Sequence, residues 1–232
     1  MCFSDEASFT VGIALIPSGV YCIWAAALKK PSFLGLAAVP LFFGMQQISE
    51  GFVWQAIHHE DAAQIRNASL VFLFFALAFW PFWFLFLGAV MEPRPRRRGM
   101  FIVLSVLATG WFWVLFYPLL MDQVSLTTQV KHHSIQFLYD DLAIYHFIPN
   151  TPLRVLYFLS VALPPLLGSE SWGRIPGLVL GASALLAVVV FDYAFVSVWC
   201  FFAAALSIYC CVIFYRLPTL GTKTLSVHPG TL

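Results

Sequence analysis

The sequence contains few charged residues. Asp, Glu, Lys and Arg make up 10% of its 232 residues, whereas 61% are hydrophobic. Soluble domains contain about 25% charged residues, so a soluble fold has too little polar surface here, and a bilayer must solvate the apolar area. The net charge of +1 argues against a nucleic-acid partner, because phosphate binding requires a basic face. The five cysteines show no CxxC motif and no paired spacing, which argues against a disulfide framework.

The sequence does contain apolar runs of membrane-spanning length, which is about 20 residues. Seven such runs lie near residues 8–28, 33–57, 68–90, 99–121, 152–168, 175–191 and 194–215. They predict an all-α integral membrane protein, a seven-helix bundle with residues 1–216 as one domain and 217–232 as a flexible cytoplasmic tail. The first run has no basic segment or small-residue cleavage site, so it is interpreted as a helix and not as a signal peptide.

Basic residues divide unequally between the two sides of the predicted bundle. Nine lie in the first, third and fifth loops and the C-terminal region, and three lie on the opposite side. Four of the nine fall in the run 94–98. Because cytoplasmic loops are rich in Lys and Arg, we expect the N-terminus outside and the C-terminus inside. The host membrane is taken as the plasma membrane by default.

The second predicted helix carries an ionisable residue inside its apolar run. Gln47, Glu50, Trp54 and His58 are separated by 3, 4 and 4 positions, which places them on one helix face. An ionisable group at membrane depth is costly and marks a candidate functional site. Glu50 is expected to be protonated, paired or bound to a cation. The alternative is a structural carboxyl hydrogen-bonded to Gln47, Tyr193 or a backbone carbonyl.

The last predicted helix has a second polar face. Tyr193, Ser197, Cys200 and Ser207 share it, and Cys200 is expected at about the depth of Glu50. Small residues on such a face also let helices pack closely, which is enough to explain Ser207. The aromatic run 72–86 is interpreted differently, as lipid-facing and interfacial, although it would also suit an apolar ligand or pigment.

The connection 122–150 is long for a loop between helices, which is typical of a lid or a binding element. Residues 135–139 alternate in polarity, so part of the loop is predicted to form a short strand pair. Five of the six histidines, at positions 58, 59, 132, 133 and 146, lie on this predicted outer side.

Cysteine, histidine and carboxylate are the side chains that bind zinc. Cys2, Glu50, His133 and His146 are therefore candidate zinc ligands on the outer side. No HxxxH, HExxH or CxxC spacing supports the site. The alternative is that the histidines are solvated or hydrogen-bonded without a metal.

Three stretches of the chain resemble a known family. They are the opening Met1-Cys2-Phe3-Ser4 followed by Ala7-Ser8-Phe9, the pattern Gln46-Gln47 with Glu50, Gly51 and Trp54, and the segment 197–204 around Trp199 and Cys200. They are similar to small multi-pass membrane proteins of unknown function whose members also begin Met-Cys-Phe-Ser. A His–aliphatic–x–Tyr element of that family has a looser counterpart at 133–137, so His132 and His133 stay alternatives. The resemblance covers nearly the whole chain and implies no activity. It strengthens Cys2, Glu50, Trp54, Trp199 and Cys200 as site residues.

Three functions follow from these features. The first is an intramembrane metal-dependent hydrolase of a lipid or amphiphile, with zinc polarising the substrate and Glu50 and His133 as catalytic residues. Gln47, Trp54, His58, Tyr193, Trp199 and Cys200 would surround that site. The second is a transporter, channel or metal-handling protein that uses Glu50 as a proton or cation site. It predicts a polar path from Glu50 to the inner face. The third is a ligand-sensing or assembly subunit, which predicts an exposed apolar patch or groove.

Overall fold

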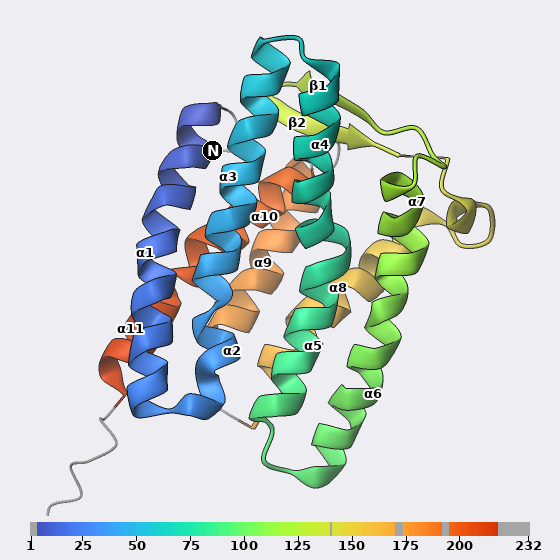
Figure 1. The fold of residues 1–232 in the computed structure, drawn as a ribbon. Helices are drawn as coiled ribbons and strands as arrows, with labels where there is room; N and C mark the ends of the chain where they lie inside the picture. The colour runs from blue at the N-terminus through green and yellow to red at the C-terminus, as the bar shows by residue number, and fades with distance from the viewer. Residues whose placement is uncertain (1–3, 140, 170–173, 192–194, 218–232) are drawn as a thin grey trace, which may run out of the picture.

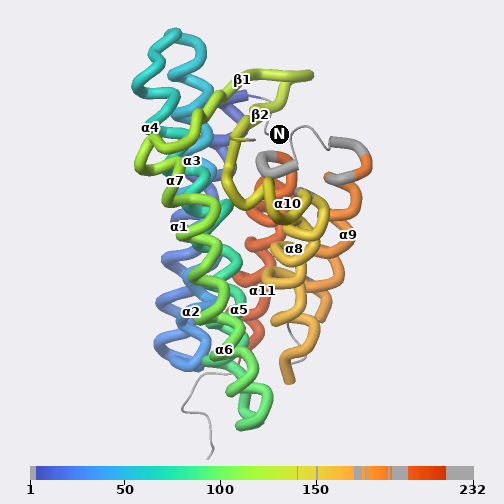
Figure 2. Tube along the Cα trace, turned by 90° about the vertical axis from the view of Figure 1, so that its right-hand side faces the viewer, coloured from blue at the N-terminus to red at the C-terminus, as the bar shows by residue number. Residues whose placement is uncertain are grey.

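The chain folds as a bundle of long helices with a β-hairpin across one end (Figures 1 and 2). This computed structural model describes residues 4–139, 141–169, 174–191 and 195–217. In chain order the elements are α1 (Asp5–Lys29), η1 (Pro31–Phe33), α2 (Leu34–Ala37), α3 (Val39–His58), α4 (Ala62–Leu73), η2 (Phe74–Phe79), α5 (Trp80–Met91), α6 (Pro95–Trp111), η3 (Phe112–Phe116), α7 (Tyr117–Leu120), β1 (Thr127–Lys131), β2 (Ser134–Leu138), η4 (Ala143–His146), α8 (Asn150–Leu167), α9 (Arg174–Phe191), α10 (Phe195–Ser207) and α11 (Tyr209–Arg216).

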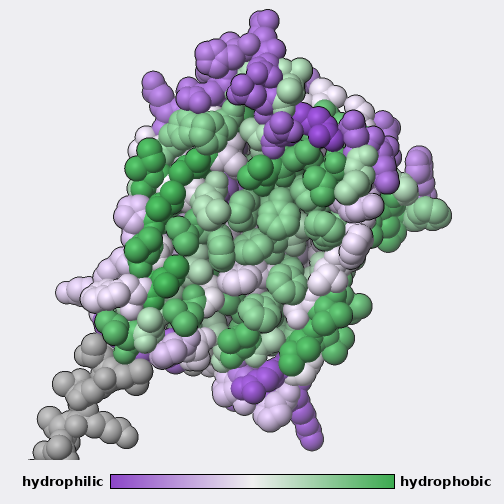
Figure 3. Space-filling model, in the orientation of Figure 1, coloured by the Kyte–Doolittle hydropathy of each residue, from purple (hydrophilic) through white to green (hydrophobic). Residues whose placement is uncertain are grey.

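Five of the described helices are long and apolar enough to cross a membrane. They are Asp5–Lys29, Pro31–His58, Ala62–Met91, Pro95–Leu120 and Val198–Arg216. Two shorter apolar helices, Thr151–Leu167 and Gly177–Ala187, lie where the fifth and sixth spans were predicted. Figure 3 shows hydrophobic side chains across the middle of one face and polar side chains at its two ends. Such an apolar belt requires lipid around it, so the prediction of a multi-pass helical membrane protein is confirmed.

The two ends of the bundle differ in chemistry, and we name them for it. The lid end holds the start of α1, the α3–α4 connection and the β-hairpin (Figure 1). The basic end holds Lys29, Lys30 and the arginines of 94–98. Lys29 Nζ donates to the carbonyl oxygen of Phe214 at 2.8 Å, which joins the end of α11 to the end of α1. The N-terminal segment and the outer loop were predicted to lie on one side. Figure 1 places the start of α1 and the β-hairpin at the same end of the bundle, the lid end.

Glycine allows α1 and α3 to pack at very short range. A Cβ on Gly19 would lie 2.5 Å from the backbone nitrogen of Leu41, and one on Gly12 would lie 3.0 Å from the carbonyl oxygen of Gly44. Small residues of this kind let membrane helices bring their backbones together. The close packing of α1 and α3 continues to the lid end, where Ser8 of α1 donates a hydrogen bond to Glu50 of α3.

Two helices of the bundle widen to π-helical turns where they pack together. These turns are η2 and η3. A π-turn disturbs the regular hydrogen-bond ladder and is frequent at functional sites. In η2 the carbonyl oxygen of Ala76 accepts a hydrogen bond from the hydroxyl of Tyr157 on α8. The side chain of Tyr157 also contacts the ring of Trp199, with the centroids 5.6 Å apart.

A buried carboxylate closes the basic end. Glu92, 2% exposed, accepts from Ser169 Oγ at 2.6 Å, from the Ser169 backbone N–H at 3.0 Å and from the Arg94 N–H at 3.1 Å. The guanidinium of Arg97 donates to the carbonyl oxygen of Leu167 at 2.8 Å. The basic run that was interpreted as a topology signal therefore also fastens the α5–α6 connection to the end of α8.

Candidate functional site: buried polar groups around Glu50

Glu50 lies inside the bundle and is completely buried. Its Oε2 accepts from Ser8 Oγ at 3.4 Å and from Gln47 Nε2 at 3.2 Å. Gln47 stands one turn before Glu50 on α3, so the predicted helix face explains that contact. The contact with Ser8 arises from the glycine-mediated packing of α1 against α3. Gln47 and Glu50 thus occupy one site, as predicted.

Gln46, on the neighbouring face of α3, joins the site to α5 and α10. Its Oε1 accepts from the indole N–H of Trp80 at 2.7 Å. Cys200 on α10 is buried and lies near the side chains of Gln46 and Glu50. The ring of Trp80 stacks on Phe43, with the centroids 3.9 Å apart. The expectation that Cys200 lies at the depth of Glu50 is therefore met.

Trp199, the neighbour of Cys200, has a packing role in the described structure. It is 3% exposed, and its indole N–H donates to the carbonyl oxygen of Leu180 on α9 at 3.3 Å. Its ring also lies against Phe158. It holds α8, α9 and α10 together beside the polar site.

Several buried polar atoms near Glu50 have no hydrogen-bond partner in the described part of the chain. They are Gln46 Nε2, Gln47 Oε1, Trp54 Nε1 and Ser134 Oγ, four of the five such atoms found. An unpaired buried polar atom costs about 1–3 kcal/mol, so native proteins rarely keep them without a bound water, ion or ligand. Their concentration at α3 and β2 makes this region a candidate binding site.

The hairpin covers the site from the lid end, and it confirms the predicted strand pair. β1 and β2 are antiparallel, with Thr128 opposite Phe137 and Val130 opposite Ile135. Ile135 is fully buried and packs in a cluster with Val53 and Trp54. Phe137 stacks on Phe72 with the ring centroids 5.1 Å apart. Apart from Ser134, the buried side chains of this lid are therefore apolar.

The three histidines of the lid, His132, His133 and His146, are exposed, whereas Glu50 is completely buried. His132 and His133 form the hairpin turn, with φ of 48° and 59°, the positive values that a two-residue turn of this type requires. His133 and His146 are both exposed, and neither makes a hydrogen bond or ion pair to a described residue. His132 and His133 thus have a local conformational role, since histidine tolerates positive φ better than most residues.

The described residues contain no group of three or more His, Cys, Asp or Glu side chains that could hold a metal ion. Two of the predicted site residues, Cys2 and Tyr193, lie outside the described residues. His58, at the end of α3, stands 3.9 Å from a carboxylate oxygen of Asp5 and is largely exposed. Its ring lies 6.2 Å from that of Trp54. His58 and Trp54 therefore lie at the lid end of the site.

Sequence reasoning missed three residues of this site. Trp80 belongs to the aromatic run interpreted as lipid-facing, but it is 2% exposed and donates to Gln46. That interpretation was wrong for Trp80, Phe72 and Phe75, all of which are buried. Gln46 belongs to the motif quoted above, but it lies off the face that joins Gln47 to Glu50. Ser8 belongs to the opening motif, but its contact with Glu50 depends on how α1 packs against α3.

The apolar helices and the enclosed polar site define a multi-pass helical membrane protein. Its chain belongs to the family of unknown function DUF6629, whose family model matches residues 1–222. The resemblance to a family of unknown function is therefore confirmed. Comparisons with curated proteins and with solved structures gave no match.

Proposed function

We propose that the chain crosses the membrane seven times, with the lid end outside and the basic end inside. The two shorter apolar helices, α8 and α9, supply the crossings beyond the five long ones. The contact of Glu92 with Ser169 supports this path, because it brings the end of α8 to the basic end. The positive-inside rule then orients the bundle. A plasma-membrane location stays a prediction.

We propose further that this protein is a sensor that binds a small inorganic cation at Glu50. The observation that carries the proposal is the wholly buried carboxyl group beside two further side chains that carry oxygen, Ser8 and Gln47. A buried carboxylate is costly unless a positive charge or a proton compensates it. Oxygen atoms of carboxylates, amides and hydroxyls are the ligands that hard cations prefer.

The amide of Gln47 can adapt to a cation. It now turns Nε2 toward Glu50 and leaves Oε1 without a donor. A half-turn of the amide exchanges the two atoms, which differ little in shape. Oε1 would then stand beside the carboxylate, where both oxygens could coordinate one ion. The flip would move Nε2 to the position that Oε1 now occupies, so coordination of the ion would have to offset an unpaired amide N–H there.

Binding is better supported than transport because the side of the site toward the basic end is closed. One turn below Gln46, the stacked rings of Phe43 and Trp80 fill the space between α3 and α5. The next residues along these helices, Val39 and Phe84, are apolar. A transporter was predicted to have a polar path continuing past Glu50, and the described residues provide none. A buried site with no polar path toward the basic end among the described residues fits a sensor.

Zinc-dependent hydrolysis of a lipid stays a prediction. Its ligand set would need Cys2, which lies outside the described residues, together with His133 and His146. Those two histidines are exposed and in the lid, whereas Glu50 is buried beneath it. The zinc content of the purified protein tests this prediction directly, since a catalytic site would retain about one ion per chain.

The cation proposal predicts that sodium stabilises the parent protein and not Glu50→Gln. Glutamine keeps the size and a hydrogen-bonding oxygen but removes the charge. A ligand that binds only the folded state raises the unfolding temperature in a saturable way. We expect this rise for the parent in nanodiscs when sodium chloride replaces choline chloride at constant ionic strength. In Glu50→Gln the apparent affinity should fall by at least about tenfold.

Glu60→Gln is the matched control, because Glu60 is exposed in the α3–α4 connection at the same end of the bundle. It should respond to sodium as the parent does. Lithium and potassium arms rank the size of ion that the site accepts. An equal response in Glu50→Gln, or no saturable response of the parent to any of the three ions, contradicts the proposal.

A further inference from the structure

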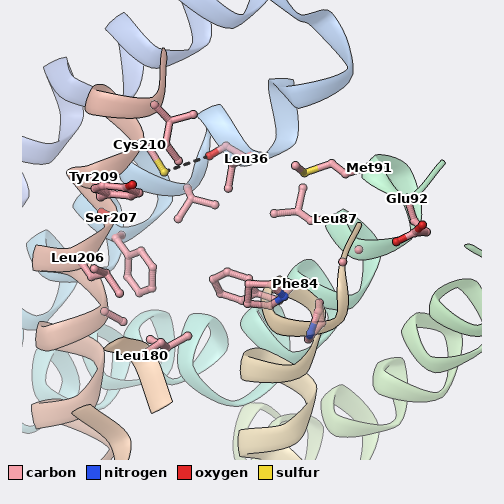
Figure 4. Close-up of a pocket in the computed structure, with 18 of the residues that line it drawn as sticks. Leu36, Phe84, Leu87, Met91, Glu92, Leu180, Leu206, Ser207, Tyr209 and Cys210 are labelled. Atoms are coloured by element: carbon pink, nitrogen blue, oxygen red, sulfur yellow. Dashed lines mark hydrogen bonds between the residues drawn. The ribbon is translucent and has the colours of Figure 1, made fainter. Parts of the chain in front are cut away.

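A second cavity lies toward the basic end, separate from the Glu50 site. Its volume is about 120 Å³, and α3, α5, α8 and α10 supply most of its walls. Figure 4 shows Leu206, Ser207 and Cys210 on one side and Phe84, Leu87 and Met91 on the other. An engineered cavity of about 150 Å³ with such a lining stays dry and binds apolar guests. The volume is therefore sufficient for part of a hydrocarbon ligand.

The two serines and the carboxylate of the cavity wall are already bonded within the protein. Ser207 Oγ donates to the carbonyl oxygen of Ala204 at 2.6 Å, and Ser169 Oγ donates to Glu92. The oxygens of Glu92 are satisfied by Ser169 and Arg94. The Glu50 site has unpaired polar atoms and calls for a polar ligand, whereas this cavity presents apolar surface. Its guest must be a hydrocarbon.

The cavity runs along the axis of the bundle to the charged surface. Along α3 and α2 it extends from Phe43 to Leu36, a rise of about 10 Å over seven residues of helix. At the basic end its wall includes Glu92 and Ser169. A chain lying in it would therefore reach from the middle of the bundle to the membrane surface, where its head group would lie.

The head-group end of the cavity is strongly basic. The four arginines of 94–98 directly follow Glu92 in sequence, and all of them are exposed. Arg97 and Arg98 donate to the backbone carbonyls of Leu167 and Glu92. Arg94 and Arg96 keep guanidinium groups without a side-chain partner among the described residues. Basic residues beside a pocket between membrane helices at the cytoplasmic surface favour anionic lipid head groups.

We propose that this cavity binds the single hydrocarbon chain of an anionic amphiphile from the inner leaflet, with its head group at Arg94 and Arg96. A long-chain fatty acid has this chemistry, and so does one chain of an anionic phospholipid. The site gives the protein a lipid contact that is independent of the cation site. It also places that contact beside the Glu92–Ser169 connection between helices.

Photolabelling of the full chain tests the proposal with a fatty acid that carries a diazirine in its tail. In nanodiscs of phosphatidylcholine, the label should map to cavity residues such as Phe84 and Leu206. Ala203→Leu fills the cavity, because Ala203 lines it and is 8% exposed. The larger leucine side chain would occupy the space that the hydrocarbon chain needs, so we expect labelling to fall by about tenfold or more.

Ala205→Leu is the matched control, since Ala205 lies on the exposed face of the same helix. It should label as the parent does. The fatty alcohol of equal length should compete less well than the fatty acid, and a joint Arg94→Gln and Arg96→Gln variant should abolish that difference. Competition by phosphatidylglycerol but not by free fatty acid would assign the chain to a phospholipid. Equal labelling of Ala203→Leu and Ala205→Leu, or equal competition by acid and alcohol in the parent, overturns the proposal.

Discussion

Gly19→Ala is expected to lower the free energy of unfolding by roughly 3 kcal/mol, at the upper end of the range for overpacking. The added Cβ would lie 2.5 Å from the backbone nitrogen of Leu41 and 2.7 Å from its Cα. These are backbone atoms, so no side-chain rotation relieves the contact and α1 must move away from α3. The unfolding midpoint in a titration with sodium dodecyl sulfate measures the effect.

Gly110→Ala, in contrast, should raise the free energy of unfolding. Gly110 lies in α6 with nothing within 4 Å of an added Cβ, and alanine in a helix interior is favoured over glycine by about 0.5–1 kcal/mol. A destabilisation of similar size in both variants would show that helix propensity, and not the distance between α1 and α3, sets the result. Because Ser8 lies on α1, Gly19→Ala should also weaken sodium binding at Glu50.

The helical membrane class and the depth of Glu50 could be predicted because they depend on local patterns. Apolar runs of spanning length leave a bilayer as the only solvent, and the spacing of Gln47 and Glu50 sets them one turn apart on any helix. The strand pair in the lid could be predicted for the same reason, since alternation is a local property. Each of these inferences needs only neighbouring residues.

The partners of Glu50 could not be predicted in this way, because they come from other helices. Ser8 reaches Glu50 only because glycines bring α1 close to α3, and a sequence does not state which helices are neighbours. Trp80 looked like one more aromatic residue for lipid. Its indole N–H needs an acceptor when it is buried, and Gln46 provides that acceptor in the bundle.

The zinc site predicted from the histidines stays a prediction. Their number on the predicted outer side suggested a shared metal, but composition does not determine the direction of a side chain. His132 and His133 occupy the two positions of a tight turn with positive φ. A turn projects its side chains outward from the end of the hairpin, whereas β2 sends Ile135 inward. His132 and His133, which are adjacent in sequence, thus form the turn of the lid hairpin.

Glu92→Gln is expected to destabilise the basic end by about 2 kcal/mol. The carboxylate accepts three hydrogen bonds, and bonds to a charged group are worth about 1.5–3 kcal/mol each before solvent screening reduces them. Glutamine has one acceptor oxygen and turns an amide N–H against a donor of Arg94 or Ser169. Its neighbours cover Glu92 but it lies at the periphery of the bundle, so the lower part of the range applies. Glu60→Gln, at an exposed position, should change stability little.

The destabilisation by Glu92→Gln should disappear in acid. Burial raises the pKa of Glu92, but hydrogen bonds from Ser169 and Arg94 and the charge of Arg97 outweigh it, so the pKa falls below its ordinary value of 4.5. A lowered pKa in the folded state means that the stabilisation is complete above the unfolded pKa and is lost as the pH falls through the folded one. Unfolding midpoints of the parent and Glu92→Gln, measured from neutral pH downward, should therefore differ most above 4.5 and converge below it. Curves that stay parallel over the whole range would mean that the charge of Glu92 does not fasten α8 to the α5–α6 connection.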